Sequence, residues 1–533
     1  MKKVKLLDCT LRDGGFLNDW EFGNNNIVNI FERLVSAQID IIEIGFLDER
    51  RILDFNRAIM PNSYAVNEIF GSLEKGETMV VGMIDYGTCK IENILISDEC
   101  YLDGIRIIFK KNDRVKAIEF CKQVKELGYK VFAQAVSITS YSNEEYLELL
   151  ELVNVLEPYA FSVVDTYGLL HKHQLMHYFN LANKHLKNSI GLGYHSHNNF
   201  QLAYANCIEL LEKSRHERML LIDGTLHGMG KGAGNAPLEL LAMYMNDHLN
   251  KEYNLEQILE AIDVNILEMY KTTPWGYSLK FFISALNACH PNYVTYLMDK
   301  KTLSIKSINE ILVNISEENK LIYNQTYVEN LYLDYQKEDC NDEDDLKKLK
   351  KAFGDKNILL LGSGNTVLTE RKSIQDYLEE NRASVIAVNF LPDYDVDFIF
   401  ISNARRYVHL ASKIKKSNSN IKLIATSNVT KTKGNFDFTL RYSSLLDEEA
   451  QFVDNPLIML IKLLNYCQVN EVALGGFDGY STSENSNYID PEMEYSFTKE
   501  KAIEINNDTI ASLSRVKNTV PLKFITKSYY FNH

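Results

Sequence analysis

Three short segments of this chain carry side chains that could bind one metal ion. Asp13 follows Arg12 and precedes two glycines, His195 and His197 are two residues apart, and Asn235 lies in a glycine-rich segment. One carboxylate, two imidazoles and one amide oxygen form a ligand set for a divalent cation. Because this set is rich in oxygen and contains no thiolate, it favours Mn²⁺ or Mg²⁺, with Co²⁺ and Zn²⁺ as alternatives.

The spacing of the two histidines indicates that they face the same way. They follow the apolar residues 190–193, and alternate side chains of a strand lie on one face. Taken alone, a His-x-His pair fits a surface strand equally well, and an Arg-Asp pair before glycines is usually a solvated turn. The third segment, residues 228–237, also follows an apolar run, which favours one shared site.

Such a centre could activate a 2-oxo acid. The acid's carboxylate and keto oxygens would both contact the metal, which neutralises enolate charge as it forms. Arg12 is the predicted catalytic residue, because a guanidinium donates two hydrogen bonds to an enolate or carboxylate oxygen. The predicted substrate contacts are Glu43, Gln134 and Thr166. A Schiff-base mechanism would use Lys110, but the metal ligands make it unnecessary.

The pattern of apolar runs predicts the scaffold that brings these residues together. Short β-rich runs occur at 4–8, 41–46, 79–84, 104–109, 130–136, 161–165, 190–196 and 219–223. Amphipathic helices are predicted between them at 26–37, 112–127, 143–155, 171–186 and 200–212. Eight strands within residues 1–250 predict a (β/α)8 TIM barrel, with a doubly wound sheet as the alternative. The site residues all fall at carboxyl ends of strands, where barrel enzymes place their chemistry.

The rest of the chain predicts two further parts. Residues 251–337 have a helical pattern and are predicted to pack on the barrel as an extension, and the acidic run 339–345 predicts a domain boundary. Residues 350–533 alternate strands and helices and predict a Rossmann-like α/β domain of unknown role. Its segment 362–364, Gly-Ser-Gly, could present backbone amides to a phosphate or could be an ordinary turn.

Composition limits the kinds of partner. The chain has 533 residues, 45% of them apolar, and a formal net charge of −15, which indicates two or three domains and argues against a nucleic-acid or membrane surface. Eight cysteines without C-x-x-C pairs, and no recognisable leader, predict a cytoplasmic protein. The expected partners are a small-molecule 2-oxo acid and an aldehyde, and a homo-oligomer is left open.

Three motifs, in order, resemble those of the DRE-TIM metallolyases. They are Asp8-Cys9-Thr10-Leu11-Arg12-Asp13-Gly14, His195-x-His197-Asn198 and Gly232-Ala233-Gly234-Asn235-Ala236-Pro237-Leu238-Glu239. The superfamily includes 4-hydroxy-2-oxovalerate aldolase and hydroxymethylglutaryl-CoA lyase, and the resemblance covers residues 1 to about 300. It implies that Asp13, His195 and His197 hold the metal, that Asn235 is a ligand or lies beside it, and that Arg12 is catalytic. The implied reaction cleaves or forms a 4-hydroxy-2-oxo acid through a pyruvate enolate.

The chain departs from the resemblance at one position. Hydroxyoxovalerate aldolases have a histidine shortly after Arg-Asp-Gly that acts as base at the 4-hydroxyl, whereas this chain continues Gly-Phe-Leu-Asn-Asp. Asp19, Glu49, His227 and Tyr167 are the candidates to replace it. Two alternatives remain: a Claisen-type acyl-CoA synthase or carboxyltransferase, and an inactive barrel that serves as a scaffold for the C-terminal domain in carbohydrate assembly.

Overall fold

The computed structural model divides into two compact units, Met1–Pro291 and Asn292–His533. It describes residues 4–213, 218–300, 303–336, 340–416, 420–430, 435–481, 487–490, 498–517 and 519–530. The predicted domain limits, 1–250, 251–337 and 350–533, stay predictions. In the described residues, no helix has both the length and the apolar character needed to cross a bilayer.

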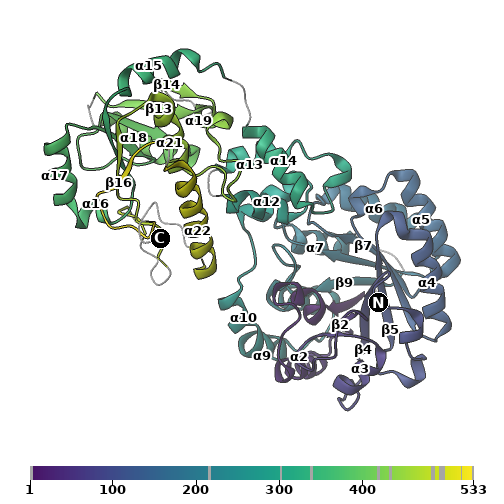
Figure 1. The fold of residues 1–533 in the computed structure, drawn as a ribbon. Coiled ribbons are helices and arrows are strands. Elements are labelled where there is room, and N and C mark those ends of the chain that lie inside the picture. Colours follow the sequence, from purple (N-terminus) through teal and green to yellow (C-terminus); the bar gives the residue numbers. More distant parts are fainter. Residues whose placement is uncertain are drawn as a thin grey trace. The chain divides into compact units, whose positions relative to one another are not determined.

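The first unit is a closed barrel of parallel strands (Figure 1). Its strands are β1 (Val4–Asp8), β2 (Ile41–Leu47), β4 (Met79–Asp85), β5 (Gly104–Phe109), β6 (Lys130–Ala135), β7 (Ala160–Asp165), β8 (Gly191–Ser196) and β9 (Leu220–Gly224). Each pairs in parallel with its neighbours, and pairing of β1 with both β9 and β2 closes the ring. The short β3 (Ile59–Met60) adds to β2. The predicted (β/α)8 barrel is therefore confirmed.

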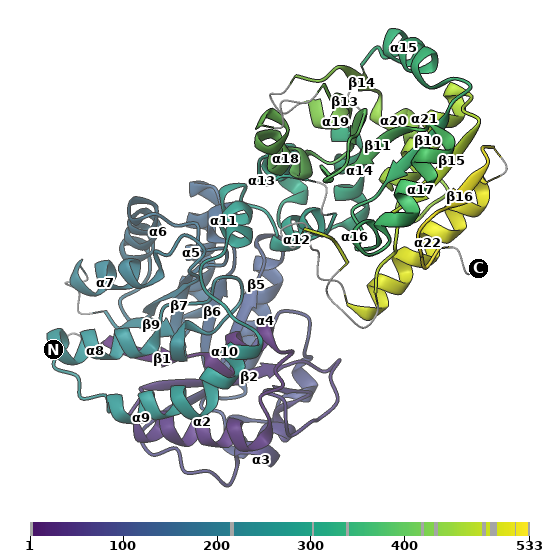
Figure 2. The same cartoon turned by 90° about the vertical axis from the view of Figure 1, so that its left-hand side faces the viewer.

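Helices surround the barrel and cover its strands (Figure 2). They are α2 (Asn24–Ser36), α3 (Ser63–Phe70), α4 (Arg114–Glu126), α5 (Asn143–Leu156), α6 (Lys172–His185), α7 (Ala203–Lys213) and α8 (Leu238–Leu249). Because both faces of each strand are covered, the strands are mostly apolar runs rather than an alternation of apolar and polar residues. Strand β2, for example, is buried at all seven positions.

A bulge in β2 lies close to the predicted site. The pairing register with β4 shifts between Glu43 and Phe46, where Gly45 has a φ of +143°. A Cβ on Gly45 would lie 2.0 Å from the carbonyl oxygen of Ala58, so only glycine fits.

The second unit contains an open, wholly parallel sheet with the order β14-β13-β12-β11-β10-β15-β16. Its strands are β10 (Asn357–Leu361), β11 (Ser384–Val388), β12 (Phe398–Ile401), β13 (Lys422–Thr426), β14 (Phe438–Leu440), β15 (Glu471–Gly475) and β16 (Leu522–Phe524). Alternate residues of β10 enter two separate apolar cores, one on each face of the sheet. Helices on both faces form these cores, including α17 (Arg371–Asn381), α18 (Ala404–Lys416), α21 (Pro456–Cys467) and α22 (Lys499–Val516). The predicted Rossmann-like architecture is confirmed.

Residues between the two sheets are helical, as predicted, but they are divided between the units. Helices α9 (Leu255–Ala261), α10 (Leu267–Thr272) and α11 (Leu279–Leu286) belong to the first unit. Helices α12 (Pro291–Asp299), α13 (Ile305–Leu312) and α14 (Gln325–Gln336) fall mainly in the second. The first part of the predicted extension packs on the barrel; α9, for instance, lies against α2.

The described part of the acidic run, from residue 340 onward, begins a packed helix, and the boundary predicted there stays a prediction. Helix α15 (Glu343–Phe353) has three acidic residues in its first turn and lysines in its last, which complements the helix dipole. Leu349 and Phe353 are fully buried in one core of the second unit. The charge pattern is therefore that of an amphipathic helix.

Candidate metal centre

Three of the predicted ligands lie together at the carboxyl ends of β1 and β8. Asp13 ends the single turn α1 (Thr10–Asp13) directly after β1, and His195 and His197 lie at the end of β8. The ligand atoms of these three residues are all within 4.8 Å of one another. Nε2 of His195 is 3.0 Å from Oδ2 of Asp13, and Nε2 of His197 is 3.7 Å from the same oxygen.

The second nitrogen of each histidine has a hydrogen-bond acceptor that fixes the ring. Nδ1 of His195 is 3.0 Å from Oδ2 of Asp223, and Nδ1 of His197 is 3.1 Å from the carbonyl oxygen of Lys231. With Nδ1 donating to these oxygens, both Nε2 atoms present lone pairs toward Asp13. The two Nε2 lone pairs and the Asp13 carboxylate converge with no proton between them, and a cation would satisfy all three. A carboxylate that accepts a hydrogen bond from the second nitrogen of a ligand histidine, as Asp223 does here, is a usual feature of metal sites.

Asn235 supplies an oxygen that the protein itself leaves unsatisfied. Its backbone pairs with that of His197, and its Nδ2 donates to the carbonyl oxygen of Met229 at 3.3 Å. Its Oδ1 is buried and accepts no hydrogen bond from the described residues. A Cβ on Gly230 would lie 2.2 Å from Nδ2 of Asn235 and 3.2 Å from Oδ1 of Asp13, so glycine is needed for this approach. A buried amide oxygen without a partner fits a metal ligand.

A closed ring of buried charges surrounds the site. Arg12 bonds Oδ2 of Asp13 through Nη1 and Oε2 of Glu43 through Nε, each at 2.7 Å. Arg106 pairs with both Glu43 and Asp223: its Nη1 is 3.0 Å from Oε2 of Glu43, and its Nη2 contacts Oδ2 of Asp223. Asp223 in turn contacts Nδ1 of His195, and Nε2 of His195 contacts Asp13, which closes the ring. The ring fixes each side chain through its two neighbours.

The electrostatics of this ring favour a cation. Two arginines face three carboxylates in a fully buried environment, which leaves negative charge to be neutralised. Burial opposes ionisation of Asp13, but Arg12 and the two histidines outweigh it and hold the pKa of Asp13 well below its usual range. Burial lowers the pKa of His197 to about 4, which keeps its imidazole neutral and able to bind metal.

Comparison with known proteins assigns the barrel to a family. Residues 3–264 match the family model described as HMGL-like. The barrel is an HMGL-like domain. The oxaloacetate decarboxylase of Mycobacterium tuberculosis is 25% identical over 284 residues, which cover 52% of this chain and 81% of the relative. The 4-hydroxy-2-oxovalerate aldolase of Bacillus cereus is 23% identical over 242 residues, which cover 45% and 69%.

Among solved structures, the N-terminal domain of a candidate aldolase from Bacteroides vulgatus aligns at 24% identity with a TM-score of 0.48, covering 57% of this chain and 99% of that one. The predicted relationship to the DRE-TIM metallolyases is confirmed. The HMGL-like domain is that of a metal-dependent carbon–carbon lyase, and its described residues include a cluster that could hold a divalent metal.

The predicted substrate contacts of the HMGL-like domain differ in what they do. Gln134 is buried on β6 with its Nε2 unpartnered among the described residues. Glu43 joins Arg12 to Arg106 through one oxygen, while Oε1 has no partner there. The hydroxyl of Thr166 accepts a hydrogen bond from the backbone N–H of Ser137 at 2.7 Å, so it also holds a loop. Substrate binding by all three stays a prediction.

The candidate bases are engaged elsewhere. Asp19 is about half exposed and pairs with Arg51 and Arg57. Glu49 accepts hydrogen bonds from Asn93 and the backbone of Lys90. The ring of His227 packs against Tyr270 and Trp275. Burial raises the pKa of Tyr167 to about 12.

Sequence reasoning overlooked Asp223 and Lys231. Asp223 was identifiable, because it is a carboxylate inside the otherwise apolar strand β9. Lys231 contributes mainly through its backbone: its N–H donates to Oδ1 of Asp13 at 3.0 Å and its carbonyl oxygen accepts from His197. Backbone contacts of this kind can be made by any residue type, so the sequence does not indicate them.

Asp223→Asn is expected to weaken metal affinity about 10–100-fold, because the amide no longer orients and polarises His195 as the carboxylate does. Titration of the metal-free protein with Mn²⁺ measures this. The matched control is Asp103→Asn, which removes a barrel carboxylate paired with Lys75 away from the ring and should leave affinity unchanged. Equal affinity in the Asp223 variant and the wild type would exclude this supporting role.

Proposed function

We propose that the HMGL-like domain cleaves or forms a carbon–carbon bond of a 4-hydroxy-2-oxo acid through a pyruvate enolate. Asp13, His195 and His197 would hold Mn²⁺ or Mg²⁺, with Asn235 as a further oxygen ligand. The observation that carries the proposal is the convergence of three donor atoms within 4.8 Å beside a buried arginine. The names of the curated relatives support the choice of a 2-oxo acid.

A divalent cation, when bound, supplies Lewis acidity to a chelated 2-oxo acid. Arg12 is proposed to donate hydrogen bonds to the keto oxygen, where negative charge grows when the carbon–carbon bond breaks. It suits this role because it lies 2.7 Å from Asp13 and is only 4% exposed, so its charge is poorly screened by water.

Glu43 and Gln134 are proposed to act around that charge. Glu43 fixes Arg12 through Nε and so determines which edge of the guanidinium faces the substrate. Gln134 is fully buried on β6 and can donate its unpartnered Nε2–H to a carboxylate or keto oxygen. The hydrogen bond from Arg12 to Glu43 and the one proposed from Gln134 to the substrate both have a fixed direction, because these side chains are buried.

A second candidate reaction is decarboxylation of a 2-oxo diacid such as oxaloacetate. It uses the same enolate but needs no base at a 4-hydroxyl, and the four candidate bases are engaged in contacts of their own or hold their proton. Loss of carbon dioxide requires only that the remaining negative charge be stabilised, which the metal and Arg12 would provide. The curated relative from Mycobacterium tuberculosis carries this name.

The experiment is a screen for pyruvate release by the Mn²⁺-loaded full chain. Substrates are 4-hydroxy-2-oxo acids with short and sugar-derived chains, together with oxaloacetate, and a parallel assay supplies a 2-oxo acid with acetyl-CoA. Pyruvate from a hydroxy-oxo acid, abolished by EDTA, supports the aldolase. Pyruvate from oxaloacetate alone supports the decarboxylase, and free CoA without pyruvate release would contradict both in favour of a Claisen-type synthase.

A further inference from the structure

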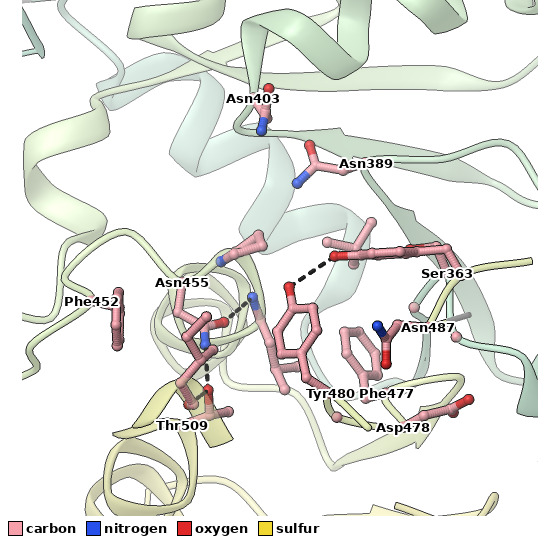
Figure 3. A pocket seen from close by; sticks show the side chains of 18 of the residues that line it. Ser363, Asn389, Asn403, Phe452, Asn455, Phe477, Asp478, Tyr480, Asn487 and Thr509 are labelled. Atoms are coloured by element: carbon pink, nitrogen blue, oxygen red, sulfur yellow. Dashed lines mark hydrogen bonds between the residues drawn. The ribbon is translucent and has the colours of Figure 1, made fainter. Parts of the chain in front are cut away.

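The second unit contains a cavity of about 270 Å³ at one end of its sheet (Figure 3). It is bordered by the loops that follow β10, β11, β12 and β15, and by the N-terminal parts of α18 and α21. This size is near the lower limit for pockets that hold small organic ligands. The cavity is far too small for a macromolecule, so its occupant is a small molecule.

The cavity lies where the strand order of the sheet reverses. From β10 the chain proceeds through β11 to β14 on one side, and then crosses to β15 and β16 on the other. Loops after β10 and β15 therefore lead away in opposite directions and open a crevice between them. In open α/β sheets, ligands bind in this crevice at the carboxyl ends of the strands.

The glycine turn after β10 does not offer its amides to a phosphate, contrary to one interpretation of the sequence. The N–H of Gly362 donates to the carbonyl oxygen of Gly475, and that of Gly364 to Gly476, each at 2.8 Å. The carboxylate of Asp478 accepts the N–H of Thr366 at 2.9 Å and thus occupies the following helix start. A ligand's anionic group would be repelled here and must lie elsewhere in the crevice.

A buried cation lies on another wall of the cavity. Arg406 is in the first turn of α18 and is only 6% exposed, with its guanidinium carbon 5.1 Å from the ring centre of Tyr488. Oδ1 of Asn403 caps this helix by accepting the N–H groups of Arg405 and Arg406. The positive end of the helix dipole adds to the arginine charge. This wall therefore carries positive charge that an anionic group could approach.

Asparagine amides and aromatic rings form part of the remaining lining, which also includes the charged residues Asp299, Lys300, Asp454 and Lys501. Asn389 and Asn403 follow β11 and β12, and Figure 3 shows both side chains on the same side of the cavity. The Asn389 amide accepts the N–H of Ser402 at 3.0 Å and donates to its hydroxyl at 3.2 Å, so a ligand would use its second lone pair or its second N–H. Phe452, Phe477 and Tyr480 present rings on the side formed by later parts of the chain. Rings stack on planar bases, whereas amides both donate to and accept from hydroxyls and base edges.

We propose that this crevice binds a nucleotide. A base would lie against the aromatic rings, ribose hydroxyls or base edges would bond the asparagine amides, and the phosphate would face Arg406 at the start of α18. Of the common small metabolites, a nucleoside phosphate combines the planar, hydroxyl-bearing and anionic parts that the three kinds of lining residue would recognise. The proposal is independent of the reaction in the barrel, because every residue it uses belongs to the second unit.

The test is calorimetric titration of the full chain with AMP, GMP, CMP and UMP, with EDTA present to exclude binding to a metal in the barrel. The corresponding nucleosides, ribose 5-phosphate and inorganic phosphate are titrated in parallel. We expect at least one nucleoside monophosphate to bind about tenfold or more tightly than its nucleoside and than ribose 5-phosphate, since base and phosphate each contribute. No binding by any of the four monophosphates, or equal binding of ribose 5-phosphate, overturns the proposal.

Arg406→Gln is expected to weaken nucleotide binding about tenfold while changing nucleoside binding little. Arg405→Gln is the matched control, because Arg405 is adjacent on the same helix but exposed and outside the cavity lining. Should Arg406→Gln unfold, as thermal melting would show, Phe452→Leu should weaken nucleotide and nucleoside alike. Equal effects of the Arg405 and Arg406 variants, or unchanged affinity in the Phe452 variant, would contradict the placement.

Discussion

Asp13→Asn is expected to reduce turnover to background and to abolish stoichiometric metal binding. Asp13 is the carboxylate toward which both histidine Nε2 lone pairs point, so its charge both binds the cation and aligns the other ligands. An amide has nearly the same shape but no charge, and an uncharged oxygen cannot offset the charges of the cation and Arg12. Elemental analysis of dialysed protein and the pyruvate-release assay measure the two effects.

The control for this prediction is Asp19→Asn. Asp19 lies six residues further along the same segment, but it is about half exposed and paired with surface arginines. Its replacement should leave metal content intact and turnover within about twofold, as expected for a screened surface pair. Because Asp13→Asn also opens the buried ring, His197→Gln provides a second test of the same site. Full metal content in both site variants would refute the proposed ligand set.

Arg12→Lys is expected to lower kcat about 10²–10³-fold, the usual cost of removing one donor aimed at developing negative charge. A lysine keeps the positive charge beside Asp13 but cannot bond Asp13 and Glu43 while also donating to the substrate, as the guanidinium fork can. Steady-state kinetics with the substrate found in the screen measure kcat, and Mn²⁺ titration measures metal affinity. Metal affinity should change little.

Arg33→Lys is the matched control for Arg12→Lys. Arg33 lies on α2 and forms a partly exposed pair with Glu260, away from the barrel mouth, and its replacement should leave both kcat and metal affinity unchanged. If Arg12→Lys lowered metal affinity in parallel with kcat, Arg12 would support the ligands rather than the reaction. If it left kcat unchanged, Arg12 would have no catalytic role.

Much of the barrel could be predicted because each of its strands is indicated by the residues within the strand itself. Buried parallel strands are continuous apolar runs, and each predicted run lies within a residue or two of a strand in the structure. The predicted ligands could be found for a related reason: each lies at the carboxyl end of a strand or in the segment after it, and the closed parallel barrel brings all such positions to one end. His195 and Asp13, 182 residues apart in sequence, are in contact as a result.

The rest depended on long-range contacts. The ring through Arg106 and Asp223 joins residues 117 positions apart, and nothing local to either residue indicates the other. Strands β14 and β16 are only three residues long, too short for a periodic signal. The packing of α15 could not be predicted locally, because its start is acidic and charged residues separate the two apolar positions that anchor it.

Exchange of pyruvate methyl protons with deuterated water tests directly whether a metal centre at Asp13, His195 and His197 stabilises an enolate. Mass spectrometry of pyruvate incubated with the Mg²⁺-loaded chain follows the exchange without requiring the natural aldehyde. We expect deuterium incorporation that EDTA, Asp13→Asn and Arg12→Lys each suppress. A metal-loaded protein that binds pyruvate yet exchanges none of its methyl protons would contradict the account and favour a barrel that serves only as a scaffold.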